Sequence, residues 1–138
     1  TPLVYGNSEG ITKMYKHEVG NNAVTSTGAS TAIAAYVQSG DFDLDVDGDG
    51  EYIMKIRRFI PDFKTLTGTA KMSLNLKDYP ADSNTPSGLS PISITSSTTK
   101  VDVRARARLI NLKVENDAVN ETWRFGTFRA DIQPDGRR

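Results

Sequence analysis

The chain has 138 residues, with 17 lysines and arginines balanced by 17 aspartates and glutamates, one histidine and no cysteine. This length suits one domain with a core of its own, and the lack of cysteine excludes disulfides and thiolate metal sites. The zero net charge removes the bulk electrostatic argument for a protein that binds nucleic acid or a membrane surface. The longest apolar run, residues 32–37, is far too short to span a bilayer, so we predict no membrane span.

The first 38 residues mix glycines with short strand-forming segments. Residues 11–19 are typical of a strand and residues 21–31 of a connecting loop, while residues 31–38 are short and glycine-flanked, which favours a strand over a helix. We therefore separate residues 1–38, as N-terminal strands and a loop, from a sandwich domain over residues 39–138. An alternative interpretation makes the N-terminal part the end of an upstream β-rich domain.

From residue 40 onward the hydrophobic pattern has a period of two. Apolar and acidic residues alternate through residues 41–47, as in an antiparallel strand with one buried face. Gly48 and Gly50 permit positive φ and indicate a turn. The next apolar segment, residues 52–60, is expected to end at Pro61, which cannot donate to a ladder, so the two segments predict a hairpin.

The rest of the chain divides into alternating segments separated by polar turns. Four further strands are expected, over residues 67–77, 92–95, 100–115 and 121–132. A polar loop with three prolines, residues 78–92, precedes the second of them, and the turn signal Pro134-Asp-Gly136 follows the last. About seven or eight strands and no convincing helix predict an all-β fold, an antiparallel β-sandwich of the jelly-roll or immunoglobulin-like kind.

The block over residues 100–115 carries a row of like charge. Three arginines share the face opposite small apolar side chains: Arg104, Arg106 and Arg108. The alternation changes phase near Leu109, which predicts a bulge or a bend at a sandwich corner. Because neighbouring like charges destabilise a sheet, the row needs acids or an anion.

Two interpretations of this arginine row remain open. One is an internal charge ladder with acids of the same chain, which are Asp41, Asp43, Asp45 and Asp131. The other is an interaction surface for phosphate, nucleic acid or the carboxylates of a partner.

The single tryptophan lies in the last expected strand, close to two phenylalanines. We predict that Trp123, Phe125 and Phe128 anchor the core. The alternative is a solvent-facing aromatic platform for a sugar, centred on Trp123.

The stretch from Asp41 to Glu51 contains six acidic residues and no basic one. Its segment Asp45-Val-Asp-Gly-Asp-Gly50 matches the first half of an EF-hand loop, yet the twelfth position holds Ile56 where the bidentate glutamate belongs. We therefore predict no metal site. A calcium site of another kind is the weaker alternative, with the ligands Asp45, Asp47 and Asp49.

No catalytic constellation stands out in the sequence. The sole histidine, His17, lies beside Glu18 in a strand-like segment, and a lone histidine is more often structural than catalytic. There is no nucleophile motif, phosphate loop or cluster with metal-ligand spacing. The chain is therefore expected not to be an enzyme and to need no cofactor.

Five phrases follow one another in a characteristic order: Tyr15-Lys-His-Glu-Val-Gly20, Ser39-Gly-Asp-Phe-Asp43, Phe59-Ile-Pro-Asp-Phe63, Val103-Arg-Ala-Arg-Ala-Arg108 and Trp123-Arg-Phe-Gly-Thr-Phe-Arg-Ala-Asp-Ile-Gln-Pro-Asp-Gly-Arg-Arg138. This order resembles the C-terminal region of virion structural proteins of tailed bacteriophages, of the tail nozzle or tail stabilisation type. The resemblance covers most of the chain. Its most specific part is the spacing from the arginine row to the tryptophan block and the terminal Asp-Gly-Arg-Arg.

The resemblance implies a role in assembly, in rings of identical subunits around the DNA exit channel of the phage tail. The implied partners are other virion proteins and copies of the chain itself, with DNA passing without specific binding, and the implied location is the virion. It also implies that the chain ends a longer polypeptide. The alternative from another class is a carbohydrate- or receptor-binding β-sandwich of a phage or secreted protein, including a calcium-dependent one.

Overall fold

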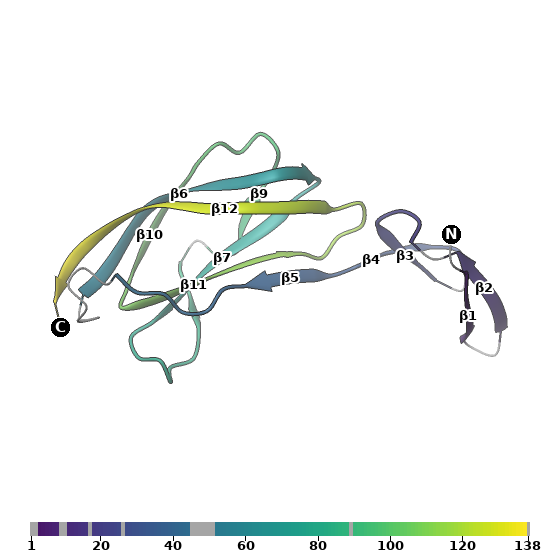
Figure 1. Ribbon diagram of the computed structural model, residues 1–138, viewed down its shortest axis with the longest axis horizontal. Coiled ribbons are helices and arrows are strands. Elements are labelled where there is room, and N and C mark those ends of the chain that lie inside the picture. Colours follow the sequence, from purple (N-terminus) through teal and green to yellow (C-terminus); the bar gives the residue numbers. More distant parts are fainter. Residues whose placement is uncertain are drawn as a thin grey trace.

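The computed structural model describes residues 3–8, 11–16, 18–25, 27–44, 52–88 and 90–137. All regular secondary structure in these ranges is β, and every strand pairing is antiparallel. Two larger sheets are packed together as a sandwich, and two small hairpins lie to one side of it (Figure 1). The prediction of an all-β, antiparallel sandwich is confirmed.

The first sheet of the sandwich has three strands in the order β10-β6-β12. Their bounds are β6 Tyr52–Thr67, β10 Val101–Ala107 and β12 Thr122–Arg137. Strands β6 and β12 remain paired from Thr122 opposite Thr67 to Arg137 opposite Tyr52. Strand β10 pairs with β6 alone and so forms one edge of the sheet.

The second sheet has the order β5-β11-β7-β8, and β9 also pairs with β7. Its strands are β5 Ala35–Gln38, β7 Ala70–Lys77, β8 Thr85–Pro86, β9 Ile92–Ile94 and β11 Leu109–Asn116. After β5 the chain continues along β11, where Phe42 forms an isolated bridge with Ile110.

Within the described ranges the chain passes between the two sheets at four places, one of which is the connection from β9 to β10 over residues 95–100. Gly68, at a φ of 76°, makes the tight turn from β6 to β7, and residues 117–121 carry the chain back from β11 to β12. At Arg108 the strand bends out of the first sheet as β10 and into the second as β11. This bend confirms the sandwich corner that the change of phase near Leu109 predicted.

The core lies between the facing sides of the two sheets. Its buried members come from five strands: Met54, Ile56, Phe59, Ala70, Met72, Leu74, Ile94, Val103, Ala105, Ala107, Ile110, Leu112 and Val114. Strand β10 alternates buried and exposed positions as its sequence predicted, because every second side chain of a strand points to the same face.

Pro61, which was predicted to end its strand, lies inside β6. The opposite strand carries a bulge there, because the pairing register shifts between Phe125 and Phe128. Gly126 approaches β6 so closely in this bulge that an added Cβ would lie 2.9 Å from the carbonyl oxygen of Asp62. A bulge leaves ladder positions unpaired and therefore accommodates a residue without an N–H.

Two other predictions from the sequence are also wrong. Pro134 and Gly136 were expected to form a turn after the last strand, but β12 continues to Arg137 with a register shift between Pro134 and Arg137. The predicted hairpin between residues 41–47 and 52–60 is wrong for its described part, since Phe42 pairs with β11 and not with β6. Residues 45–51 lie outside the described ranges.

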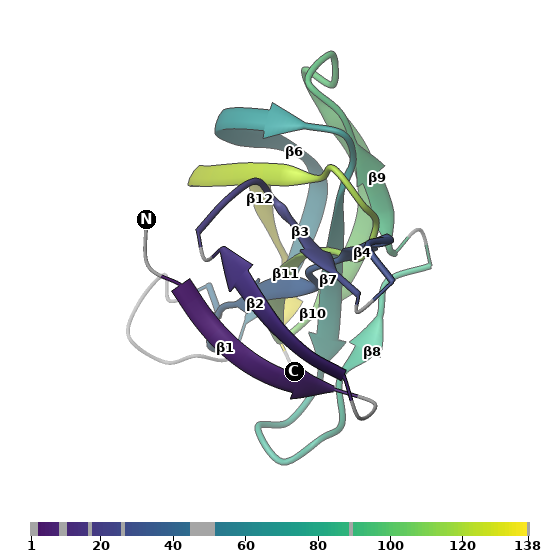
Figure 2. The ribbon, with the colours of Figure 1, turned by 90° about the vertical axis from the view of Figure 1, so that its right-hand side faces the viewer.

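The N-terminal residues form two hairpins, which we call the arm: β1 Leu3–Ser8 pairs with β2 Ile11–Lys16, and β3 Asn22–Val24 with β4 Ser30–Ala32. The first strand was not predicted, and the expected loop over residues 21–31 contains β3 and the start of β4. Figures 1 and 2 show the arm at one end of the sandwich, with β5 leading from it into the second sheet.

Candidate functional site

The arginine row lies on the outer face of β10. Arg104 and Arg106 are exposed, and Arg108 is half-buried at the corner between the sheets. Arg106 donates from Nε to Asp135 Oδ2 at 2.6 Å and from Nη2 to the Asp135 carbonyl oxygen at 3.3 Å. This hydrogen bond lowers the pKa of Asp135, and the charges of Arg106 and Lys55 add to the effect.

The other two arginines of the row differ from Arg106. The guanidinium carbon of Arg108 lies 5.7 Å from the centre of the Tyr79 ring, a cation–π distance. Arg104 has no hydrogen-bond or ion-pair partner within the described ranges.

The acids suggested for an internal ladder are engaged elsewhere. Asp41 accepts hydrogen bonds from Lys77 Nζ at 2.9 Å and from Asn111 Nδ2 at 2.7 Å, and Asp131 lies 3.7 Å from Arg58. Residues 39–44 follow β11 in the second sheet while the row lies on the first, and Asp131, although on the first sheet, lies beside Arg58, so the contacts of Asp41 and Asp131 do not form the predicted ladder.

The other two acids suggested for the ladder, Asp43 and Asp45, form no described contact with the arginine row. Asp43 is exposed and has no hydrogen bond or ion pair with another described residue, and Asp45 lies outside the described ranges.

Asn111 is the centre of a buried amide network that sequence reasoning missed. Its Nδ2 donates to Asp41 and to Asn84, and its Oδ1 accepts from Gln38 and Asn75 at 3.1 and 2.9 Å. The hydrogen bond from Asn111 is the main cause of a lowered pKa of Asp41, and the hydrogen bond from Lys77 adds to it. The network joins β5, β7, β11 and two connecting segments, so we assign it a structural role.

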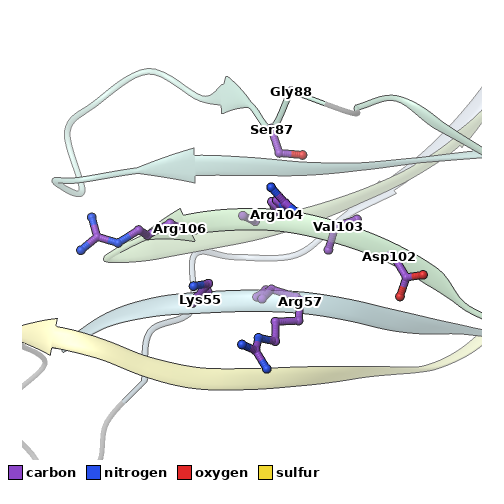
Figure 3. Close-up of a pocket in the computed structure, with 10 residues that line it drawn as sticks. Lys55, Arg57, Ser87, Gly88, Asp102, Val103, Arg104 and Arg106 are labelled. Carbon is purple, nitrogen blue, oxygen red and sulfur yellow. The ribbon is translucent and has the colours of Figure 1, made fainter.

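Arg104 and Arg106 of the arginine row line one side of a cleft of about 880 Å³, which we call the cationic cleft. Figure 3 shows Arg104 and Arg106 on β10, Lys55 and Arg57 on the neighbouring β6, and Ser87 and Gly88 on the segment opposite β10. The lining also includes Asp102, Ile56, Val103 and Ala105. The far wall is attached to the second sheet, since the Ser87 N–H donates to the Leu74 carbonyl oxygen at 2.8 Å.

The charges of this cleft are unbalanced. Its lining has four basic side chains and one acid, Asp102, although the whole chain has no net charge. Arg57, like Arg104, has no hydrogen-bond or ion-pair partner in the part of the chain that the structure describes. Lys55 and Arg57 were not predicted from the sequence, because their position beside the arginine row depends on how β10 pairs with β6. In that register Lys55 lies opposite Arg106.

The aromatic residues of β12 pack along the margin of the core. The rings of Trp123 and Phe125 meet Phe63 edge to face at centroid distances of 6.4 and 5.3 Å, and Phe128 lies 5.6 Å from Phe59. All three predicted anchors are partly buried and pack against the core.

Trp123 also takes part in a link between the sandwich and the arm. Its Nε1 donates to Asn116 Oδ1 at 3.0 Å, and Asn116 Nδ2 donates to the Ile33 carbonyl oxygen at 3.1 Å. Trp123 therefore has the contacts of a packed residue, which gives no support to a free sugar platform. A second link joins Asn22 of β3 to Asn120, through bonds of 2.6 and 2.7 Å.

Large apolar side chains are exposed on the arm and on β5. They are Met14, Val19, Val24, Ile33, Tyr36 and Val37, with exposed fractions from 48% to 69%. The first four of them line a groove of about 570 Å³. We call these four residues the apolar surface of the arm. Tyr36 and Val37 are neighbours on β5 of the second sheet and point to opposite faces of that strand.

The described ranges contain no group of three or more histidine, cysteine, aspartate or glutamate side chains placed to hold a metal ion. The weak candidates Asp45, Asp47 and Asp49 fall outside those ranges, as does His17. None of the described segments is a helix with the length and apolar character needed to cross a membrane. Neither protein-family models nor curated proteins give a match to this chain.

Proposed function

We propose that this chain is a structural domain of a bacteriophage tail, of the nozzle or tail stabilisation type, which assembles with copies of itself and with other virion proteins. The observation that carries the proposal is the apolar surface of the arm. The order of sequence phrases described above supports the phage assignment.

Exposed apolar residues that gather in one place indicate a contact surface, whereas single ones are common on any protein. Four of the nine large apolar side chains that are exposed in the described ranges belong to this surface. Burial of apolar area stabilises an association by about 25 cal/mol per Å². A neighbouring copy that covers the groove would therefore be stabilised by the burial of these side chains.

The position of the arm also supports an assembly role. The two asparagine links, Asn22 with Asn120 and Asn116 with Ile33, attach it to one end of the sandwich. An arm held there extends beyond the sandwich, where a neighbouring subunit can meet it (Figure 1).

The test compares Val24→Asp with Ile60→Asp in sedimentation velocity of the full chain over a range of concentrations. Both residues are exposed apolar members of strands, but Ile60 lies on β6, away from the arm. We expect Val24→Asp to weaken self-association roughly ten- to hundredfold, because it places a charge in the contact, and Ile60→Asp to leave it nearly unchanged.

A chain that is monomeric at every concentration, or equal association of the two variants, would argue against the proposal. In the native particle, electron cryo-microscopy is expected to find this domain in a symmetric ring of the tail. Its absence from the tail would refute the phage assignment.

A further inference from the structure

We propose that the cationic cleft binds an extended acidic segment of a partner protein, which adds as a strand to the free edge of β10. This inference concerns a second surface and does not depend on the arm.

The first argument is the open edge of β10. The strand is seven residues long and pairs with β6 on one side only, and no described strand pairs with its other side. An open edge presents backbone N–H donors and C=O acceptors that an added strand can satisfy. Backbone pairing at this edge would supply affinity without requiring a particular sequence.

The second argument is charge. Arg57 and Arg104 have no ion-pair or hydrogen-bond partner among the described residues, and Arg106 and Lys55 interact with the same carboxylate, Asp135. Like charges on adjacent strands repel, so these cations destabilise the sheet until an anion lies between them. Carboxylates pair with guanidinium groups through short, directional hydrogen bonds.

The third argument is the mixed character of the cleft. Its lining includes the buried side chains of Ile56, Val103 and Ala105 as well as the cations. Successive outward positions of a strand are about 6.6–6.8 Å apart, which is also the spacing along an added strand. An added segment that alternates acidic and apolar residues would therefore place its carboxylates beside Arg104 and Arg106. Its apolar side chains would then lie against the apolar residues of the cleft lining.

These features favour a peptide over a nucleic acid. A phosphodiester backbone has acceptors but no donors, so it would leave the carbonyl groups of the β10 edge unpaired. The chain has no net charge to attract a polyanion from a distance. Asp102 lies at the opposite end of the labelled β10 residues from Arg106 (Figure 3) and would repel a phosphate, whereas a basic residue of a peptide could pair with it.

The experiment measures binding of a fluorescent peptide, Gly-Asp-Phe-Asp-Leu-Asp-Val-Asp, to the full chain by fluorescence anisotropy. This probe is used for its alternation of acidic and apolar residues, and a second peptide with asparagine at every aspartate is the control. We expect the acidic peptide to bind at least ten times more tightly than the control, and more weakly as salt is added.

The protein variants use a matched pair of double substitutions. Arg57→Gln with Arg104→Gln removes the two unpaired cations of the cleft, and Arg124→Gln with Arg129→Gln removes two exposed arginines of β12 in the same sheet. The first double variant is expected to lose at least tenfold in affinity for the acidic peptide, and the second less than threefold. Amide hydrogen exchange of residues 103–107 should slow when the peptide binds, because strand addition pairs the edge.

Equal binding of the two peptides, or equal loss in the two double variants, would overturn the proposal. Tighter binding of a DNA duplex than of the acidic peptide, lost with Arg57 and Arg104, would also overturn it and assign the cleft to nucleic acid. Unchanged exchange in residues 103–107 with the peptide bound would rule out strand addition. Self-association of Val24→Asp is measured in a separate experiment. A negative result for peptide binding at the cleft would therefore not contradict the assembly proposal.

Discussion

The sandwich and the arm contain similar strand-forming residues but bury them to very different degrees. Phe59 and Ile56 are fully buried between two sheets, whereas Met14 and Val24, in two-stranded hairpins, are more than half exposed. A hairpin on its own is marginally stable, while stacked sheets of three or more strands enclose a core. The difference indicates that the sandwich supplies most of the folding stability and that the arm contributes little buried core.

The strongest way to break this comparison is to shorten one apolar side chain in each region. Phe59→Ala removes a fully buried ring that contacts Phe128, so we expect the free energy of unfolding to fall by about 3–5 kcal/mol. Val24→Ala, at a position 54% exposed, should change it by less than about 0.5 kcal/mol. Urea denaturation of both variants measures the two values, and a similar loss in each would contradict the assignment of stability to the sandwich.

A second prediction concerns the close approach of β6 and β12. In Gly126→Ala the new Cβ would meet the Asp62 carbonyl oxygen, so the strands must move apart, at a loss of roughly 1–3 kcal/mol. Gly40 lies between β5 and the Phe42 bridge, and an added Cβ there would meet no atom within 4 Å, so Gly40→Ala is expected to be neutral or slightly stabilising. Thermal unfolding of the two variants tests this, and an unchanged melting temperature for Gly126→Ala would mean that the bulge yields easily.

The smallest expected effect concerns Asp41, which lies just after β5 along the second sheet. The pKa of Asp41 is lowered in the folded chain by the bonds from Asn111 and Lys77. Its carboxylate therefore contributes stability above the ordinary aspartate pKa, and the contribution is lost as the pH falls through the lowered value. Asp41→Asn should reduce the melting temperature near pH 7, with a difference from the parent chain that narrows as the pH falls below the ordinary aspartate pKa.

Asp43→Asn is the control for this titration, because Asp43 is exposed and makes no hydrogen bond with a described residue. It should have the melting temperature of the parent chain at pH 7. If both variants behave alike, the contact between Asp41 and the second sheet contributes nothing measurable.

The fold class could be predicted because period-two alternation is a local property. The phase change near Leu109 located a sandwich corner correctly, since a strand that changes its buried face must change sheets or bulge. Pro61 misled the prediction because it lies opposite a bulge of β12, and Pro134 because it lies beside a register shift on β12, which is an edge strand. For Pro61 that information lies in the distant residues around Gly126 and cannot be read from the proline itself.

The cleft was predictable only in part. Alternation alone placed Arg104 and Arg106 on one exposed face, and the structure agrees. Lys55 and Arg57 belong to a segment almost fifty residues earlier, and only the β10-β6 register brings them alongside. The choice of Asp41 as a partner failed because charge complementarity in a sequence does not say which sheet a segment joins.

The link through Asn116 gives the molecule an internal optical reporter. The chain has one tryptophan, and the same amide side chain that accepts the Trp123 N–H donates to the backbone of the arm at Ile33. A movement of the arm that displaces Asn116 would expose the indole to water and change its emission. Intrinsic fluorescence can therefore follow arm docking in the unlabelled protein, without interference from a second emitter of the same kind.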